Sequence, residues 1–446
     1  MLEVDRILDD VEKLDLLLSG KFFAYIYETG DEKLANFAMK ALQRFYNKNM
    51  LDFTVYRSAV FLEREIVSFC KKLLHGEDTY GTFTYGGTES IMLAALSARN
   101  SFWKRRGKGE VPEILSPYTI HPSFAKSAHY LGMNIKYFGV DERLKADVES
   151  LKESIDEKTA LITISAPNWP FGTVDPVREI AEVAMDKGTL LHVDACLGGF
   201  ILPFFEKLGE KVEQFDFRVE GVTSISADLH KYGYAPKGAS VVLFRSADLK
   251  KESMFVDTQN PGYVFVNPTV LSSRSVGPLA SAFAVVKYLG EEGYLRLSKQ
   301  VLEARETILD GLKSLGFESV APVESSILSL FNREIDLLSF TTAMREMGWH
   351  FHLQREVRRL SIPMNIHLTI SPIHKNTARD FVSDAEKAVE KSKNEKREMK
   401  ISIEKILGDL RLGKIDSSIA PLLVDAFDPE VAKELVKELV MNLYGD

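Results

Sequence analysis

The runs ALITIS at residues 160–165, LLHV at 190–193 and SVVLF at 240–244 decide the fold of this chain. Each run is short and mostly apolar, as expected of a strand that is buried on both faces of a sheet. Helical stretches lie between these runs and in the same region. Strands of this kind that alternate with helices predict a mostly parallel sheet in an α/β layered domain.

The hydrophobic periodicity changes along the chain and predicts four regions. Residues 1–58 form a helical N-terminal segment, and residues 59–292 form the large α/β domain. Longer helices with a few strands at residues 293–395 predict a smaller α+β domain. Residues 396–446 form a C-terminal helical extension, in which Asp428 is expected to cap a helix that begins at Pro429.

Composition and charge argue against several classes of function. The 446 residues include 56 basic and 64 acidic side chains, and the net charge of −8 gives no electrostatic reason to bind nucleic acid or an anionic membrane. No window has the roughly 18 apolar residues of a membrane span, so no stable membrane insertion is expected, and no signal peptide is visible. Cys70 and Cys196 have no metal-ligand spacing, so we expect no metal site and a cytoplasmic location.

The segment TYGGTES at residues 84–90 stands directly before an apolar helix. Small residues at a helix N-terminus expose backbone N–H groups, and the helix dipole favours an anion there. The hydroxyl groups of Thr88 and Ser90 can add further donors to such an anion. An ordinary capped helix start explains the same residues, so this segment alone does not decide between the two interpretations.

Asp194 ends the buried run LHVDA at residues 191–195. A carboxylate is costly to bury in apolar surroundings unless it meets a cation or a donor, and sites in α/β folds lie at the carboxyl ends of strands. A protonated pyridine nitrogen is such a cation, and its protonation makes the ring an electron sink. The alternative is a strand-end carboxylate that caps a turn.

Lys231 lies in SISADLHKYG at residues 224–233, which again follows a strand-like run. A lysine amine forms an imine with an aldehyde cofactor when its surroundings lower its proton affinity. Ser226 and His230 are close enough in sequence to reach a phosphate beside that imine. A lysine is usually a surface residue, but no helical polar face accounts for this one.

His121, in HPSFAKSA at residues 121–128, offers a flat imidazole that can stack on a planar cofactor. A lone histidine at a helix start is otherwise a cap or a surface group. The order of the four features decides between these interpretations. The anion loop, the stacking group, the acid for a ring nitrogen and the imine lysine follow one another, each where an α/β scaffold places a site. Together they predict an enzyme that binds pyridoxal 5′-phosphate (PLP).

Five segments resemble the group II PLP decarboxylases of fold type I and, within that family, look most like the sphingosine phosphate lyases. They are TYGGTESIMLA (84–94), HPSFAKSAHYLGM (121–133), SAPNWPFGTVDP (165–176), HVDACLGGF (192–200) and GVTSISADLHKYGYAPKGASVVLF (221–244). The resemblance covers roughly residues 20–390, and HKYGYAPKG is its most specific part. It implies the PLP-dependent transferase-like fold of the aspartate aminotransferase superfamily, a PLP cofactor and a small-molecule amine substrate.

The resemblance also implies roles for individual residues. Lys231 corresponds to the Schiff-base lysine, Asp194 to the partner of the pyridine nitrogen, and His121 to the residue that stacks on the ring. Asn168 is expected near the phenolic oxygen of the cofactor. The residues expected to hold the cofactor phosphate are Gly87, Thr88, Ser226 and His230.

Two further features follow from the resemblance. Lys237, six positions after the Schiff-base lysine, corresponds to a lysine that serves the substrate phosphate, and Tyr27 is the best match to a catalytic tyrosine with a related role. The loop containing Thr269, Ser273 and Arg274 corresponds to one that approaches the site of a neighbouring protomer. The resemblance therefore implies a homodimer, in which we expect residues 1–58 to contact the partner.

One departure from the family pattern concerns the substrate. Asp52 aligns with a histidine that helps to bind a substrate phosphate in the lyases, and a carboxylate beside a phosphate is repulsive. Retained Lys237 favours retro-aldol cleavage of a phosphorylated β-hydroxy amine to an aldehyde and phosphoethanolamine. Asp52 supports decarboxylation of an L-amino acid, of the tyrosine, aspartate or glutamate decarboxylase type, as the alternative. A non-catalytic scaffold is the third reading, and the intact Lys231 argues against it.

Overall fold

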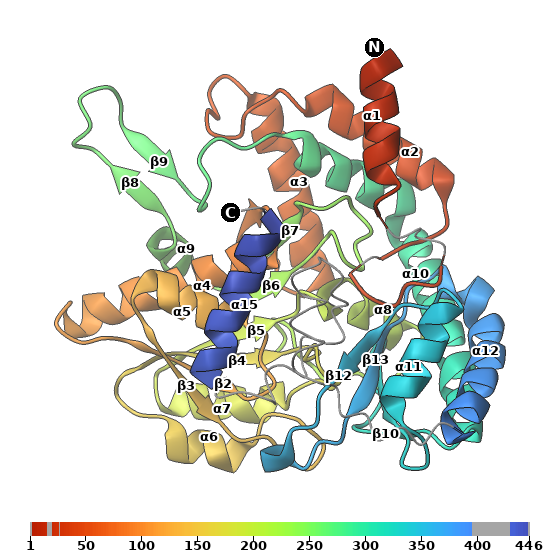
Figure 1. Cartoon of the computed structure of the whole chain (residues 1–446). Helices are drawn as coiled ribbons and strands as arrows, with labels where there is room; N and C mark the ends of the chain where they lie inside the picture. Colours follow the sequence, from red (N-terminus) through yellow and green to blue (C-terminus); the bar gives the residue numbers. More distant parts are fainter. Residues whose placement is uncertain (1, 16–19, 26, 395–428, 445–446) are drawn as a thin grey trace.

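The computed structural model describes residues 2–15, 20–25, 27–394 and 429–444. Figure 1 shows a large sheet at its centre, with the order β1-β7-β6-β5-β4-β2-β3. Strands β2 to β6 run parallel, whereas β7 is antiparallel to its neighbours β1 and β6, so the predicted mostly parallel sheet is confirmed. The strands are β1 Tyr80–Thr84, β2 Glu113–Pro117, β3 Asn134–Phe138, β4 Thr159–Ser165, β5 Leu190–Asp194, β6 Ser224–Ala227 and β7 Ser240–Phe244.

Helices cover both faces of this sheet, because successive residues of a buried strand point to opposite sides. In β4, Leu161 packs in one core with Ile91 and Phe124, whereas the next residue, Ile162, packs in the other core with Ile180. The helices of this domain are α4 Gly87–Arg106, α5 Ser123–Leu131, α6 Val148–Ser154, α7 Val177–Asp186, α8 Leu202–Lys207 and α9 Ala247–Glu252, with the short 3-10 helix η1 Gly198–Phe200 before α8.

A smaller domain with an antiparallel sheet of order β10-β11-β13-β12 follows, as the sequence predicts. Its elements are β10 Glu318–Ser319, β11 Ile327–Phe331, α11 Leu337–Glu346, β12 His352–Gln354, η2 Arg358–Leu360, β13 Asn365–Thr369 and α12 His374–Asn394. Helix α10, Gly277–Ser314, joins the two domains and bends at Gly290, where the backbone is not helical. The predicted boundary at 292/293 falls within this helix, close to its bend.

The N-terminal region contains α1 Leu2–Glu12, α2 Glu32–Phe45 and α3 Arg57–Leu73. Between α1 and α2 the chain runs along the small domain: the N–H of Phe23 donates to the carbonyl of His350 (2.8 Å), and the N–H of Thr369 donates to the carbonyl of Phe23 (2.9 Å). These backbone bonds fix the path of the segment that carries Tyr27 toward the large domain.

Two further elements complete the described chain. The hairpin of β8 Phe255–Asp257 and β9 Phe265–Asn267 projects from the body of the molecule (Figure 1). Helix α15, Pro429–Tyr444, begins at the predicted residue, while Asp428 and most of the expected extension lie outside the described residues. Over the described ranges, no helix combines the length and the apolar character that a membrane span requires.

Candidate active site

Polar side chains end three neighbouring parallel strands at one edge of the large sheet. Ser165 on β4 pairs in register with Asp194 on β5, which in turn pairs with Ser226 on β6. Lys231 follows β6 in a turn, in which its N–H donates to the carbonyl of Asp228 (3.3 Å). The parallel topology therefore brings segments that are far apart in the sequence to one place, the carboxyl edge where α/β folds build their sites.

A cavity of about 490 Å³ lies between this edge and the beginning of α4. It is large enough to hold a cofactor or a small ligand. Its walls include six of the eight residues expected to bind the cofactor, but neither Tyr27 nor Lys237. The six are Gly87, Thr88, His121, Asp194, His230 and Lys231.

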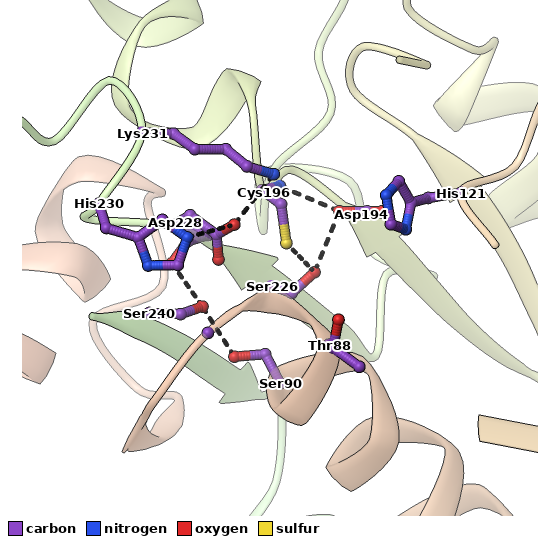
Figure 2. A network of polar contacts seen from close by, with 12 residues as sticks. Thr88, Ser90, His121, Asp194, Cys196, Ser226, Asp228, His230, Lys231 and Ser240 are labelled. Atoms are coloured by element: carbon purple, nitrogen blue, oxygen red, sulfur yellow. Dashed lines mark hydrogen bonds and ion pairs between the residues drawn. The ribbon is translucent and has the colours of Figure 1, made fainter. Parts of the chain in front are cut away.

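The Lys231 amine forms an ion pair inside this cavity. Its Nζ lies 3.0 Å from Oδ2 of Asp228, whose side chain is only 1% exposed (Figure 2). Burial by itself lowers the pKa of Lys231, but the carboxylate of Asp228 outweighs this effect, and Cys196 and Tyr27 also contribute, so the pKa is raised overall. The surroundings of Lys231 therefore favour its protonated form.

Asp194 is 7% exposed and is oriented by neutral donors. Its Oδ1 accepts the N–H of Cys196 (3.0 Å) and the hydroxyl of Ser226 (3.3 Å). The Ser226 oxygen also lies 3.1 Å from Nε2 of His192 and 3.3 Å from Sγ of Cys196. A hydroxyl has one proton and two lone pairs, so this hydroxyl donates to Asp194 and accepts from His192 and Cys196.

The glycine loop before α4 packs very closely against the turn that carries Lys231. A Cβ atom on Gly87 would lie 2.7 Å from Sγ of Cys196 and 2.8 Å from Oδ2 of Asp228, so only glycine fits here. Thr88 places its hydroxyl 3.0 Å from that of Ser123. The loop thus presents the beginning of a 20-residue helix to the cavity, where the helix dipole favours negative charge.

Glu89 fixes this loop to a distant segment. Its Oε2 accepts the N–H of Tyr85 (2.6 Å), and its Oε1 accepts the N–H groups of Val270 (2.8 Å) and Leu271 (3.3 Å). Val270 and Leu271 line the cavity and supply apolar surface near its opening. One carboxylate therefore joins the two sides of the cavity mouth.

His121 lies across the cavity from Lys231 (Figure 2). Its Nδ1 accepts the N–H of Ser123 (3.2 Å), so the proton of the neutral ring is on Nε2. Desolvation lowers the pKa of His121, while the charge of Asp194 acts in the opposite direction. A neutral imidazole with a flat face toward the cavity is suited to stacking on an aromatic ring.

Tyr27 and Lys237 lie together on the side of Lys231 that faces the N-terminal segment. The Tyr27 ring packs edge-on against Tyr232 with the centroids 4.8 Å apart, and Nζ of Lys237 lies 5.4 Å from the Tyr27 ring centroid. The same ammonium donates to the carbonyl of Tyr25 (2.7 Å). Desolvation raises the pKa of Tyr27 to about 12, so its phenol keeps its proton at neutral pH.

Comparison with known proteins agrees with this geometry. Residues 14–328 match the pyridoxal-dependent decarboxylase conserved domain. The chain belongs to the pyridoxal-dependent decarboxylase family. It is 35% identical to the sphingosine-1-phosphate lyase of Arabidopsis thaliana, over 87% of this chain and 72% of that protein. It is also 32% identical to a probable L-tyrosine/L-aspartate decarboxylase of Methanothermobacter thermautotrophicus, over 68% of this chain and 82% of that protein.

A solved structure supports the same assignment. The sphingosine-1-phosphate lyase of Burkholderia pseudomallei superposes with a TM-score of 0.82 at 30% identity, covering 91% of this chain and 94% of that one. The curated sphingosine-1-phosphate lyases are longer proteins, of which this chain spans between 61% and 72%. As a member of the pyridoxal-dependent decarboxylase family, this chain is a PLP-dependent enzyme with the fold type I architecture.

The residues around the cavity fit PLP. The Gly87 position leaves backbone exposed where a Cβ atom would close the space. Asp194 would supply a carboxylate for a pyridine nitrogen, and Lys231, in the cavity wall beside Asp228, would supply the amine. Bound PLP supplies an electron sink, while the protein orients the substrate and moves protons. We therefore assign the holding of the ring and phosphate to this set, with His121, Thr88 and His230.

Two of the expected cofactor contacts differ in the structure. Asn168 does not line the cavity: its Nδ2 donates to Oγ1 of Thr173 (2.6 Å) and the carbonyl of Leu144 (3.2 Å), and its Oδ1 accepts from Phe171 (3.0 Å). These bonds use both N–H donors of the side chain within its own loop. Ser226 is also outside the cavity wall, and its hydroxyl donates to Asp194.

The loop expected to approach a neighbouring protomer is held largely by contacts within its own chain. Arg274 is 5% exposed, and its Nη1 donates to the carbonyl of Phe83 in the same chain (3.1 Å). Thr269 is buried, and its hydroxyl donates within the loop to Oδ1 of Asn267 (2.9 Å). Ser273 is exposed. Within one chain, Ser273 is therefore the exposed residue of the three, and the approach of this loop to a neighbouring protomer stays a prediction.

Asp52 lies away from the cavity. Its Oδ1 accepts from the N–H of Thr54 (2.9 Å), the hydroxyl of Thr54 (2.6 Å) and the N–H of Val55 (3.1 Å), so it holds an exposed turn. Within one chain, its carboxylate therefore does not oppose a substrate phosphate. Within the single chain, Asp52 therefore gives decarboxylation no support.

Two important residues were missed by the sequence reasoning. Asp228 lies within the lysine motif, but the sequence analysis assigns it no role. Like Asp194, it is a carboxylate at the end of a buried strand. The same burial argument would have identified it. Glu89 gave no such signal, because its partners at Val270 and Leu271 are about 180 residues away in the chain.

Proposed function

We propose that this chain cleaves the Cα–Cβ bond of a phosphorylated β-hydroxy amine, as a lyase of the sphingosine-1-phosphate lyase type that yields an aldehyde and phosphoethanolamine. The observation that carries this proposal is the placement of Lys237 and Tyr27 together beside Lys231. A cation and a neutral phenol can both donate to a phosphate oxygen. The relatives named sphingosine-1-phosphate lyase add support from their own assignments.

The chemistry needs proton transfer at two places. A base removes the proton of the β-hydroxyl, the Cα–Cβ bond breaks to release the aldehyde, and the electron pair left on Cα must then take up a proton. Tyr27, His121 and Lys231 are the groups near the cavity whose atoms can hold or deliver these protons. Asp194 would keep the ring nitrogen of bound PLP protonated, and the cofactor would then supply the electron sink for the charge at Cα.

Decarboxylation of an L-amino acid is the second candidate, supported by the Methanothermobacter relative. An α-carboxylate is most often recognised by an arginine, which binds both of its oxygens in one plane. Among the described residues that line the cavity there is no arginine, and the cations there are Lys126 and Lys231. Lys237 lies outside this lining, beside Tyr27, and is the cation that we propose for a substrate phosphate.

One incubation separates the two candidates. The purified protein, supplied with PLP, is mixed with a sphingoid base phosphate or, separately, with tyrosine, aspartate and glutamate. We expect an aldehyde and phosphoethanolamine from the first mixture and no carbon dioxide from the others. Release of carbon dioxide alone would reject the lyase proposal.

A variant of Lys237 tests the phosphate contact. Lys237→Ala should raise KM for a phosphorylated substrate by roughly 10- to 100-fold. This corresponds to the loss of about 1.5–3 kcal/mol, which is the contribution of a hydrogen bond to a charged group. Lys126→Ala is the control, because Lys126 is a lysine of α5 that lines the cavity, whereas Lys237 packs against Tyr27. An equal rise in KM for unphosphorylated amines would mean that Lys237 has a structural role, for example through Tyr25.

We also propose that the active unit is a homodimer. The β8–β9 hairpin exposes Phe255, Val256, Tyr263 and Val264, each more than half exposed, and α1 likewise exposes Val4, Ile7, Leu8 and Val11. Apolar patches of this kind usually mark an interface. Val264→Asp should shift the protein toward monomer in light scattering, whereas Val111→Asp, at an exposed site in the loop after α4, should not. A monomeric unaltered protein would contradict the proposal.

The cytoplasmic location that the sequence suggests stays a prediction.

A further inference from the structure

The ion pair between Lys231 and Asp228 is the most unusual charged contact in the cavity. The carboxylate is 1% exposed, its Oδ2 lies 3.0 Å from the Lys231 ammonium, and its Oδ1 is buried without a hydrogen-bond partner. A buried carboxylate with an unsatisfied oxygen is expensive to keep. Asp228 is not needed to orient Asp194 or to cap a helix, so the fold gives no structural reason for its charge.

Asp228 also lies against the proposed phosphate cradle. A Cβ on Gly87, the first residue of α4, would be 2.8 Å and 2.9 Å from the two oxygens of this carboxylate. His230 approaches from the other side, with its Nε2 3.6 Å from Oδ2. Since Nδ1 of His230 accepts the N–H of Ala239 (3.2 Å), the neutral ring presents its Nε2 proton to the carboxylate. The helix N-terminus and this proton stabilise the negative charge of Asp228.

We propose that Asp228 is the counter-ion that holds Lys231 as an ammonium in the cofactor-free enzyme, and thereby sets the pH at which this lysine can bond to the cofactor. Asp228 acts through Lys231, so it is a positioning residue and not a catalytic one. The proposal rests on the proposed role of Lys231 as the residue that bonds to PLP. It adds that Asp228 controls the pH at which the cofactor-free enzyme takes up PLP.

The chemistry of the bond explains why a counter-ion matters. A lysine nitrogen attacks an aldehyde carbon only as the neutral amine, because an ammonium has no lone pair. The ammonium must therefore first release one proton to solvent, and the aldehyde oxygen later leaves as water when the C=N bond forms. A carboxylate at 3.0 Å favours the ammonium and so opposes the first of these steps.

Several other titratable groups face Lys231 and belong in the same account. The charge of Asp194 favours its protonated form, Cys196 and Tyr27 would do so only when ionised, and the charge of Lys237 opposes it. Asp228 is the only one of these groups for which an ion pair with Lys231 is present in the described part of the chain. Removal of its charge should therefore have the largest effect on Lys231.

Asp228→Asn tests the proposal, because it removes the charge and keeps the size of the side chain. The full-length protein is freed of cofactor and mixed with PLP between pH 6 and pH 10, and bond formation is followed by visible absorbance. In the unaltered chain the rate should rise about tenfold per pH unit across this range. In the variant the rate of bond formation at pH 7 should be at least roughly tenfold higher than in the unaltered chain. It should also stop rising with pH at some point between pH 6 and pH 10. Borohydride trapping and peptide mapping assign the bond to Lys231.

A second aldehyde separates an effect on the lysine from an effect on the phosphate. 5-Deoxypyridoxal has the same ring and aldehyde but no phosphate. If Asp228 acts through Lys231, the variant should react faster with both compounds. A gain seen only with PLP, with an unchanged pH dependence, would overturn the proposal, because Asp228 would then act by repelling the phosphate.

The control is Asp216→Asn. Asp216 is fully buried and also ion-paired, with Arg218 (2.9 Å), but it lies outside the cavity. Its variant should leave the pH dependence of bond formation unchanged. If Asp228→Asn fails to fold, acetylation of Lys231 in the unaltered cofactor-free protein replaces it: Lys231 should react more slowly than exposed Lys108 at pH 9, and equal reactivity would contradict the proposal. If neither aldehyde bonds to Lys231 in the unaltered protein, the cofactor assignment itself is wrong.

Discussion

Two buried aspartates at the ends of adjacent strands are treated differently by the same fold. Asp194, at the end of β5, accepts a backbone N–H from Cys196 and a hydroxyl from Ser226, both neutral donors. Asp228, directly after β6, is paired with the ammonium of Lys231. Figure 2 shows the two carboxylates on either side of Cys196.

The difference explains how two carboxylates in one cavity can have separate roles, one toward a cation of the ligand and one toward Lys231. Neutral donors orient a carboxylate but leave its charge uncancelled, so Asp194 remains available to a cation that a ligand brings. The charge of Asp228 is balanced within the chain. A ring cation is therefore drawn to Asp194, and the lysine is held by Asp228 until its ammonium gives up a proton.

Lys231 is the cation that balances Asp228, and its removal should have the largest effect. Lys231→Ala should abolish the visible absorbance of bound PLP and lower kcat by roughly 10⁴-fold or more, as when a member of a covalent catalytic unit is lost. Asp228 then loses its cation, so the melting temperature should also fall. Absorbance spectra and calorimetry measure the two effects, and unchanged visible absorbance would refute the cofactor assignment.

Removal of the charge of Asp194 tests the other carboxylate. Asp194→Asn keeps the size of the side chain but leaves a ring nitrogen without its anion, and we expect kcat to fall on the order of 10³-fold, equivalent to about 4 kcal/mol for a lost buried charge partner. Lys231 should still bond to PLP, since its own counter-ion is intact. Steady-state kinetics and absorbance spectra separate these effects. A variant that bonds no cofactor would show that Asp194 and Asp228 are not independent.

The sequence predicted one of these aspartates and not the function of the other. The parallel sheet, the order of the motifs and the positions of Asp194, His121 and Lys231 follow from apolar runs and from residues at strand ends. Asp228 has a similar local signal, but its role depends on the 3.0 Å contact with Lys231, which sequence spacing alone does not give. A separation of three residues permits such a contact in a turn without requiring it.

The contacts predicted for Asn168 and Ser226 show the opposite limit. Both residues lie in segments that resemble the family, but hydroxyl and amide groups have several possible partners. Ser226 is directed to Asp194 by the register of β5 and β6, and Asn168 is directed to Thr173 by its own loop. Neither the strand register nor the loop geometry can be derived from the residue types.

Gly87 connects the two aspartates, because its neighbours include both Asp228 and the Cys196 that donates to Asp194. Gly87→Ala should weaken PLP binding by roughly 100-fold, equivalent to about 3 kcal/mol of overpacking, since the added Cβ would lie 2.7 Å from Sγ of Cys196. Fluorescence titration with PLP measures the change. Gly109→Ala is the matched control, because a Cβ there has no neighbour within 4 Å. Equal affinity in both variants would mean that the cradle can relax.

The smallest effect concerns His192, which reaches Asp194 only through the hydroxyl of Ser226. Burial lowers the pKa of His192 to about 4, against about 6.5 in the unfolded chain, so the folded protein keeps a neutral ring. Between these values the unfolded state binds more protons, and the free energy of unfolding therefore falls as the pH drops from 6.5 toward 4. For His192 alone this loss is about 2 kcal/mol between pH 7 and pH 5.

His192→Gln removes this dependence and retains hydrogen-bonding groups, so the variant should lose less stability than the unaltered protein between pH 7 and pH 5. Urea unfolding at the two pH values gives both free energies. Buried His367 and His374, whose pKa values are lowered by burial to about 3 and about 4, contribute an acid loss that is common to both proteins and cancels in the comparison. Identical losses would show that the ring is not held neutral, and that Ser226 orients Asp194 without help from His192.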